Sequence, residues 1–218
     1  MSRCFAVCFV AILYCCSCLF AADWSQFRGA GGQGHAAVES LPTQWGPDKN
    51  VTWKVEIPGE GWSSPVVHEG RIYLTAAVPV DEASDDRLLQ TLCLDGKTGK
   101  TIWTRDIFEQ NGETAPRIHS KNSHASPTPL IHDGQIYVHF GHQGTACLDL
   151  DGKLIWKGKP VDYRPVHGNG GSPVVFDDML IFSTDGAKKQ DVNALNRHSG
   201  ELVWKTERGI ERAKKFAF

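Results

Sequence analysis

Histidines are the first residues in this chain of 218 residues whose number suggests chemistry, since there are nine of them. His119 and His124 lie five positions apart in a predicted loop, and His139 and His142 lie three apart near a predicted strand end. Only the second spacing suits chelation of a zinc or copper ion, and no Asp, Glu or Cys nearby completes either set. We therefore expect no metal site and interpret these side chains as solvated loop histidines.

A glycine-rich segment at residues 29–34 matches the G-x-G-x-x-G string of dinucleotide-binding sites. That motif requires a strand before it and a helix after it. Here the segment follows Gln26-Phe27-Arg28 and runs into Leu41-Pro42 without a helix-forming stretch, which indicates a flexible loop. The chain also lacks a Ser-His-Asp pattern and a nucleophile elbow, so we predict no catalytic residue.

The cysteines concentrate at the start of the chain. Five of the seven lie in the first 18 residues: Cys4, Cys8, Cys15, Cys16 and Cys18. A basic start, an apolar run and a closing Ala21-Ala22 are typical of a Sec-type signal peptide, so residues 1–22 predict a secreted or periplasmic protein with no membrane span after cleavage. Ser17-Cys18 leaves lipid anchoring open as a minor alternative, although the residues before it make a weak lipobox.

Composition excludes several classes of protein. The formal net charge is −2, from 23 basic and 25 acidic residues, so binding of nucleic acid through phosphate neutralisation is not expected. Twenty-two glycines, 11 prolines and 7 tryptophans suit many short strands and turns, whereas 2 methionines and the lack of long helix-forming runs argue against a helical bundle.

An internal repeat organises the rest of the chain. Trp53, Trp103, Trp156 and Trp204 are spaced by 50, 53 and 48 residues, and a Ser-Pro pair precedes each of the last three, at residues 64–65, 126–127 and 172–173. After each pair come a short apolar strand, an acidic or glycine turn, a dense apolar strand, a third strand, a glycine turn and a strand that carries the tryptophan. Each unit is therefore predicted to form four antiparallel strands.

The second strand of each unit, at 72–74, 136–138 and 180–182, is apolar on both faces, so its sheet must be covered on both sides. We predict an all-β fold, a β-propeller of four-stranded antiparallel blades, here an open arc of about three. A β-sandwich of hairpins is the alternative. A leader loop at 23–50 precedes a partial propeller at 51–218, with a stray strand around Trp53 and blades at approximately 63–107, 125–160 and 171–207.

Cys93 and Cys147 end the third strands of successive units, where the third unit has Ala194. Equivalent positions in neighbouring blades are too far apart for a disulfide, which needs Cα atoms within about 7 Å. We expect two free, buried thiols.

Residues 93–103 resemble the tryptophan-docking motif of quinoprotein-type propellers: a small residue, Asp two positions on, Thr-Gly at a turn, and Trp four after the glycine. In that family the tryptophan packs between blades. The second unit lacks Thr-Gly, and the third has Asn for Asp and Ser for Thr. The corresponding residues are Asp95, Gly99 and Trp103, then Asp149, Gly152 and Trp156, then Asn196, Gly200 and Trp204.

The whole chain after the signal resembles the amino-terminal part of a PQQ-binding-like propeller, of the group that includes the outer-membrane assembly factor BamB. The family implies seven or eight blades, so we expect a truncated product or fragment that self-associates. Its dehydrogenase members use an Asp base, acidic and amide calcium ligands, and a disulfide between adjacent cysteines. Cys15-Cys16 is the only adjacent pair and lies in the signal peptide. No cofactor is expected.

The segments before the Ser-Pro pairs are polar and rich in glycine. In a propeller the first strand of each blade is innermost, so these loops should ring one mouth of the central channel, where functional sites commonly lie. The candidate binding residues are Trp62, Lys121, Asn122, His124, His167 and Asn169. In the alternative interpretation, Gly and Asn merely permit tight turns there.

These observations predict a secreted or periplasmic scaffold for binding or assembly, without catalytic activity, whose partner is a protein or a component of the cell envelope. The alternative is the amino-terminal part of a PQQ-dependent alcohol or sugar dehydrogenase, which would require PQQ and calcium. A propeller-type hydrolase or a sugar-binding module is a further possibility.

Overall fold

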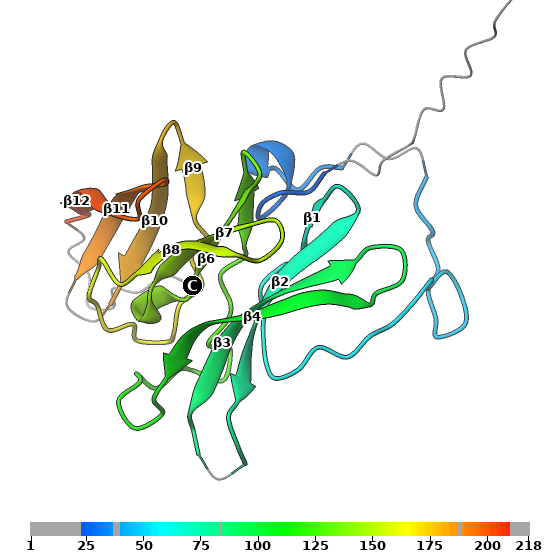
Figure 1. Ribbon diagram of the computed structural model, residues 1–218, viewed down its shortest axis with the longest axis horizontal. Helices are drawn as coiled ribbons and strands as arrows, with labels where there is room; N and C mark the ends of the chain where they lie inside the picture. Colours follow the sequence, from blue (N-terminus) through cyan, green and yellow to red (C-terminus); the bar gives the residue numbers. More distant parts are fainter. Residues whose placement is uncertain (1–22, 37–39, 83, 187–188, 210–218) are drawn as a thin grey trace, which may run out of the picture.

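Short apolar segments joined by tight turns form twelve strands in the part of the chain that the computed structural model describes, residues 23–36, 40–82, 84–186 and 189–209. The predicted signal peptide lies outside these residues. The strands are β1 (Val66–His68), β2 (Arg71–Pro79), β3 (Arg87–Asp95), β4 (Thr101–Gln110), β5 (Leu130–His132), β6 (Gln135–His139), β7 (Thr145–Asp149), β8 (Leu154–Gly158), β9 (Val174–Phe176), β10 (Met179–Asp185), β11 (Gln190–Asn196) and β12 (Leu202–Glu207). Each run of four consecutive strands forms one antiparallel sheet (Figure 1).

Left-handed backbone at the hairpin turns explains why the first two strands of the first and second sheets pair so closely. Glu69 and Gly70 have φ angles of 48° and 75°, and Asp133 and Gly134 have φ angles of 48° and 69°. Two successive positive φ angles match the right-handed twist of the flanking strands, and glycine adopts them without strain. The two turns predicted from Glu-Gly and Asp-Gly therefore form as hairpins.

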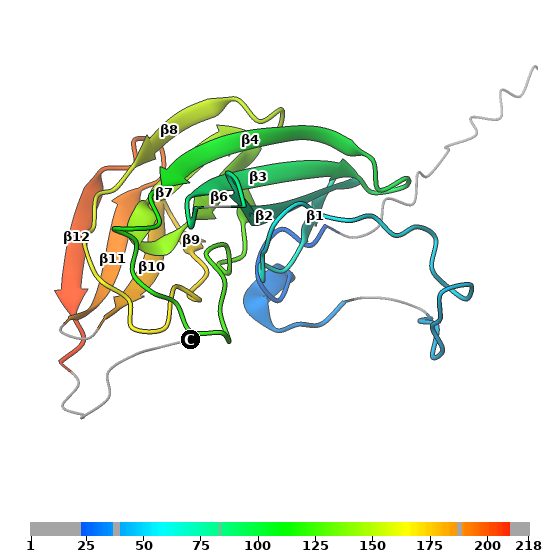
Figure 2. The same cartoon turned by 90° about the horizontal axis from the view of Figure 1, so that it is seen from below.

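The three sheets follow one another in chain order and enclose two cores, which confirms the open arc of blades and excludes the sandwich (Figure 2). The first core joins Tyr73 of β2 to Ile136 of β6, and the second joins Tyr137 of β6 to Leu180 of β10. Ile136 and Tyr137 are neighbours that point to opposite faces of β6. The middle sheet is therefore covered on both sides, as its doubly apolar second strand predicts.

The same local geometry recurs in all three blades. Cys93 pairs with Trp103 across the third and fourth strands, Cys147 pairs with Trp156, and Ala194 pairs with Trp204, and a register shift follows each small residue. Cys93 and Cys147 are buried and free, as expected. Burial raises the pKa of the Cys93 thiol to about 11 and that of Cys147 to about 12, so both are neutral packing residues.

Tryptophans connect each blade to the next. Trp103 of β4 donates its indole N–H to the Leu150 carbonyl of the second blade at 3.1 Å, and its ring lies against Gly152, where a Cβ would approach to 2.8 Å. Trp156 of β8 does the same with the Arg197 carbonyl, at 2.9 Å, and with Gly200. Because a side chain at either glycine would occupy the place of the indole, glycine is required there.

Acidic and amide side chains shape the turns that receive these indoles. Asp95 Oδ1 accepts the backbone N–H groups of Lys97 and Thr98, and these hydrogen bonds, together with the Thr98 hydroxyl, lower the pKa of Asp95. Asp149 and Asn196 accept backbone N–H groups in the same way in the second and third blades. Asn196 can replace Asp because a neutral amide oxygen also accepts two hydrogen bonds.

Two expectations about the first blade need correction. The segment around Trp53 is not a strand, but its indole donates to the Gly96 carbonyl at 3.1 Å and lies against Gly99. Trp53 therefore docks on the following blade in the same way as Trp103 and Trp156, although it lies in no sheet. We call these three tryptophans the docking series. Strand β4 also runs to Gln110, beyond the predicted end of the blade at residue 107.

The leader residues lie along the inner edges of the first two blades. Trp24 and Val67 exchange backbone hydrogen bonds of 2.8 and 2.9 Å, and the Ser25 carbonyl accepts from the Ile131 N–H at 2.7 Å. The glycine-rich segment that follows contains only the short 3₁₀ helix η1 (Ala30–Gly32), so it lacks both the strand and the α-helix of a dinucleotide site. Its Gly29 packs against the Trp24 ring.

Candidate functional site

The entrances to the three innermost strands are joined by hydrogen bonds in blade order. Trp62 N–H donates to the Ala125 carbonyl at 3.1 Å, which links the segment before β1 to the segment before β5. Ser64 N–H donates to Thr128 Oγ1 at 3.1 Å, and Thr128 N–H donates to Ser172 Oγ at 2.9 Å, which continues the link to the segment before β9. We call residues 59–63, 121–125 and 167–171 the mouth loops.

The second and third mouth loops are bound to each other through Asn122 and His167. Asn122 Nδ2 donates to the His167 carbonyl at 3.2 Å, and its Oδ1 accepts from the Ser126 hydroxyl. The imidazole of His119 stacks on that of His167 with ring centroids 5.0 Å apart. Lys121 is exposed, and its backbone N–H donates to His119 Nδ1. The fold thus brings together side chains that lie 45 residues apart in the chain.

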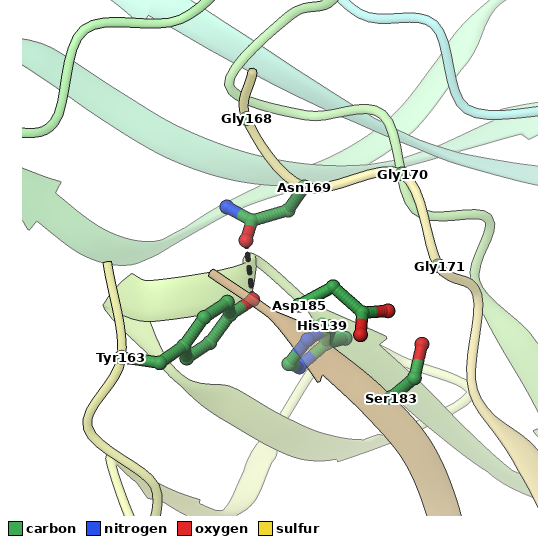
Figure 3. A pocket seen from close by; sticks show the side chains of 8 residues that line it. All are labelled: His139, Tyr163, Gly168, Asn169, Gly170, Gly171, Ser183 and Asp185. Atoms are coloured by element: carbon green, nitrogen blue, oxygen red, sulfur yellow. Dashed lines mark hydrogen bonds between the residues drawn. The ribbon is translucent and has the colours of Figure 1, made fainter. Parts of the chain in front are cut away.

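Asn169 of the third mouth loop turns inward rather than toward the surface (Figure 3). Its Oδ1 accepts from the Tyr163 hydroxyl, and its amide nitrogen lies 3.4 Å from His142 Nδ1. Gly141 has a φ angle of 59°, and a Cβ there would fall within about 2 Å of the Asn169 side chain. Asn169 therefore needs Gly141, the first residue of the 3₁₀ helix η2 (Gly141–Gln143), in order to pack between the second and third blades.

His139 and His142 are buried, so the interpretation of this pair as solvated loop histidines is wrong. A 2.9 Å hydrogen bond joins His139 Nδ1 to Thr145 Oγ1, and the His139 ring packs on Phe182 of the third blade. Burial lowers the pKa of His139 to about 3 and that of His142 to about 4, since a charged imidazole would lose its hydration there. Both rings are neutral at pH 7 and serve the interface between blades.

A small polar pocket of about 20 Å³ lies beside these histidines. It is lined by His139, Tyr163, Asn169, Ser183 and Asp185 (Figure 3). One oxygen of the buried Asp185 pairs with the Arg208 guanidinium, and the other, Oδ2, has no hydrogen-bond partner in the protein. This volume suits a single water molecule. In the part of the chain that the structure describes, no three His, Cys, Asp or Glu side chains form a group suited to a metal ion.

Trp62 and His124 have contrasting environments in the same part of the site. Trp62 is 54% exposed, and its indole is the large apolar side chain that the mouth loops present to solvent. The His124 ring is half-buried, and its Nδ1 lies 3.1 Å from Gln110 Nε2 at the end of β4. Burial lowers the pKa of His124, and the nearby Arg87 charge adds to this effect.

Sequence reasoning did not find Tyr163, Asp185, Gln110 or Arg87. Tyr163 and Asp185 lie in stretches that break the repeat pattern, between β8 and β9 and at the end of β10. Arg87 and Gln110 are adjacent across β3 and β4, where they form the last pair of the register. The predicted pairing of the third and fourth strands could have placed Arg87 and Gln110 side by side. The sequence around them, however, gives no sign that the following loop folds back to enclose them.

Comparisons with known proteins agree with the fold. The family model described as outer membrane protein assembly factor BamB matches residues 28–160 and 92–215. The chain is 32% identical over 91 residues to methanol dehydrogenase [cytochrome c] subunit 1 of Methylobacterium organophilum, a match that covers 36% of this chain and 14% of that protein.

Two solved structures are similar in fold. The quinohemoprotein alcohol dehydrogenase from Comamonas testosteroni matches with a TM-score of 0.50 and 21% identity over 69% of this chain and 21% of that chain. The quinohemoprotein alcohol dehydrogenase ADHIIG from Pseudomonas putida HK5 matches with a TM-score of 0.50 and 18% identity, over 71% of this chain and 22% of that chain. The chain therefore spans only about a fifth of these proteins. Because the family model extends from residue 28 to residue 215, the chain belongs to the PQQ-like repeat family described as outer membrane protein assembly factor BamB.

Proposed function

We propose that the chain forms part of a β-propeller that acts as a binding or assembly scaffold without catalytic activity, and that the mouth loops contact its partner. The observation that carries this proposal is that hydrogen bonds join the first mouth loop to the second, from Trp62 to Ala125, and the second to the third, from Asn122 to His167, so that the three loops form one platform. Rigid loops that display an exposed Trp62 and Lys121 suit recognition of a protein surface, because tryptophan supplies much contact area at low entropic cost. The description of the family as an assembly factor supports the same role.

The partner of this scaffold is proposed to be a protein or another component of the cell envelope. The basic start, apolar run and small residues of 1–22 support secretion or a periplasmic location, with lipid anchoring at Cys18 as a minor alternative. Among the described residues, no helix is long and apolar enough to span a membrane.

A dehydrogenase is the second candidate, favoured by the 32% identity to a methanol dehydrogenase subunit. Among the described residues, no three His, Cys, Asp or Glu side chains form a group suited to a metal ion, and the chain spans only about a fifth of the dehydrogenase structures that it matches. We therefore derive no catalytic step from this part of the chain.

Reconstitution separates the two functions. The purified chain is incubated with PQQ and calcium, desalted, and assayed for quinone absorbance and for dye-linked oxidation of methanol, ethanol and glucose. The scaffold predicts neither bound quinone nor dye reduction. Retained quinone together with substrate-dependent dye reduction would overturn it.

Binding through the mouth loops is tested by paired tryptophan variants. The chain is immobilised, and solubilised cell-envelope proteins from its source are passed over it. A specific partner should be lost when Trp62→Ala is combined with Lys121→Ala and should be retained by Trp45→Ala, which removes an indole that is 64% exposed on the leader. Equal retention by both variants, or no specific partner at all, would count against the proposal.

Self-association is predicted from the exposed face of the third blade. Val174 of β9 and Trp204 of β12 are 51% and 37% exposed, whereas their counterparts in the first blade, Val66 and Trp103, are 0% and 8% exposed. The two residues lie in one row across the sheet and so on one face of it, and exposed apolar surface on such a face favours association. Sedimentation velocity should show oligomers that grow with concentration, and Val174→Lys should reduce them more than Val203→Lys, because Val203 is exposed to about the same degree as its counterpart Ile102 in the first blade. A monodisperse monomer at all concentrations would refute the prediction.

A further inference from the structure

A second polar pocket, of about 220 Å³, lies at the ends of β3 and β4 in the first blade. Strand β3 begins at Arg87 and β4 ends at Gln110, and the loop that follows, residues 111–129, folds back over both. The side chains that line the pocket include Asp85, Arg87, Gln110, Arg117, Ile118 and His124. The tryptophans of the docking series do not line this pocket, and the hydrogen bonds between the mouth loops involve other residues.

Two arginines give the pocket positive charge. Within the described ranges, neither Arg87 nor Arg117 has a carboxylate within the 4.0 Å of an ion pair. The Nε–H of Arg87 is buried and has no hydrogen-bond partner in the protein. A buried donor without an acceptor is costly, so this side chain is arranged for a group that the protein itself does not supply. The Arg87 charge also faces His124 closely enough to lower its pKa.

Gln110 gives the pocket an acceptor. Its side chain is almost fully buried, with 2% of the residue exposed, and its Nε2 donates to His124 Nδ1 at 3.1 Å. The amide oxygen, Oε1, is buried without a partner. With Nδ1 as acceptor and a lowered pKa, His124 is a neutral ring that carries its proton on Nε2. Asp85 adds an exposed carboxylate at the rim, and Glu60 also faces His124.

We propose that this pocket binds a small hydroxycarboxylate of the sugar-acid class, with its carboxylate on Arg87 and Arg117 and a hydroxyl group donated to Gln110 Oε1. Arginine is suited to planar recognition of a carboxylate. An inorganic anion without a proton, such as sulfate at neutral pH, would leave the Gln110 oxygen unsatisfied and would meet Asp85. A neutral sugar would leave the arginines unpaired. The volume suits a ligand below drug size.

The proposal goes beyond the scaffold function and does not depend on it. The pocket is built from blade one and the loop after it, so it would bind a small molecule whether or not the mouth loops recognise a protein. Failure of the partner-capture experiment would leave this site untouched, and failure of the binding experiment below would leave the scaffold untouched.

Ligand-observed NMR titration of the mature chain tests the site, because it tolerates self-association. Glucuronate is the probe, compared with glucose, which lacks the carboxylate, with acetate, which lacks hydroxyl groups, and with sulfate, which carries no proton to donate. We expect glucuronate to bind at least about tenfold more tightly than the other three, since each lacks one of the two charged or polar contacts.

Variants locate the binding in this pocket. Arg87→Gln and Arg117→Gln should each weaken glucuronate binding at least about tenfold, whereas Arg28→Gln, on the exposed leader, should leave it unchanged. Arg117 is exposed, so its variant keeps the test valid if Arg87→Gln impairs folding. Equal binding by Arg117→Gln and the unchanged chain, glucose or sulfate binding as tightly as glucuronate, or no glucuronate binding at 10 mM (about 2.7 kcal/mol) would overturn the proposal.

Discussion

Replacing Trp103 with alanine is expected to lower the free energy of unfolding by about 3–5 kcal/mol, as for other large truncations in a packed core. The Trp103 side chain is 8% exposed, packs on Gly152 of the next blade and donates to the Leu150 carbonyl. Its loss removes apolar contact and leaves that carbonyl without its indole donor. Urea unfolding of the mature chain, followed by circular dichroism, measures the change.

Trp204 is the matched control for this prediction. It occupies the equivalent position of the third blade but is 37% exposed, and its indole N–H contacts only Met179 Sδ of its own sheet in the described structure. Trp204→Ala should therefore cost only about 1 kcal/mol. If the two variants are equally destabilised, the stability does not come from docking between blades.

Acidification from pH 7 to pH 5 is expected to destabilise the fold by about 2 kcal/mol for each of His139 and His142. Their pKa values, about 3 and about 4, lie below the value of about 6.5 in the unfolded chain. The unfolded state therefore takes up protons first as the pH falls. The stabilisation is fully present above pH 6.5 and is lost progressively down to the folded-state pKa values.

Urea unfolding at pH values between 5 and 7 measures this slope. His139→Asn should reduce the pH dependence by about one proton, while retaining a polar atom near Thr145 Oγ1. His35→Asn is the control, since His35 is exposed on the leader. The charged groups around His142 include Lys159, Arg164 and Asp162, and His142 opposes protonation of His139 once it takes up a proton itself. An unchanged slope in His139→Asn would assign the acid sensitivity to other groups.

Local and periodic features of the fold were predictable because they depend on rules that act over a few residues. The Glu69-Gly70 and Asp133-Gly134 turns require positive φ angles that glycine tolerates, and these hairpins form as predicted. The doubly apolar second strands require cover on both faces, and β6 has it from both neighbouring blades. The docking glycines follow from the spacing to each tryptophan.

Predictions failed where the outcome depends on contacts distant in sequence. His139 and His142 look like loop residues by spacing, but the third blade packs over them and removes their hydration. The segment around Trp53 has a strand-like sequence, yet no sheet pairs with it in the described structure, and only its indole finds a partner. Side-chain docking requires one contact, whereas a strand requires a continuous ladder.

The sequence by itself determined the repeat, the all-β blades and the free cysteines, since each follows from periodicity and turn chemistry. The tertiary structure alone decided which polar groups meet. Tyr163, Asn169 and His142 converge because blades two and three pack together, and Arg87, Gln110 and His124 converge because residues 111–129 fold back over two strand ends. Such convergence depends on the relative placement of whole sheets and loops, which no local pattern of residues specifies.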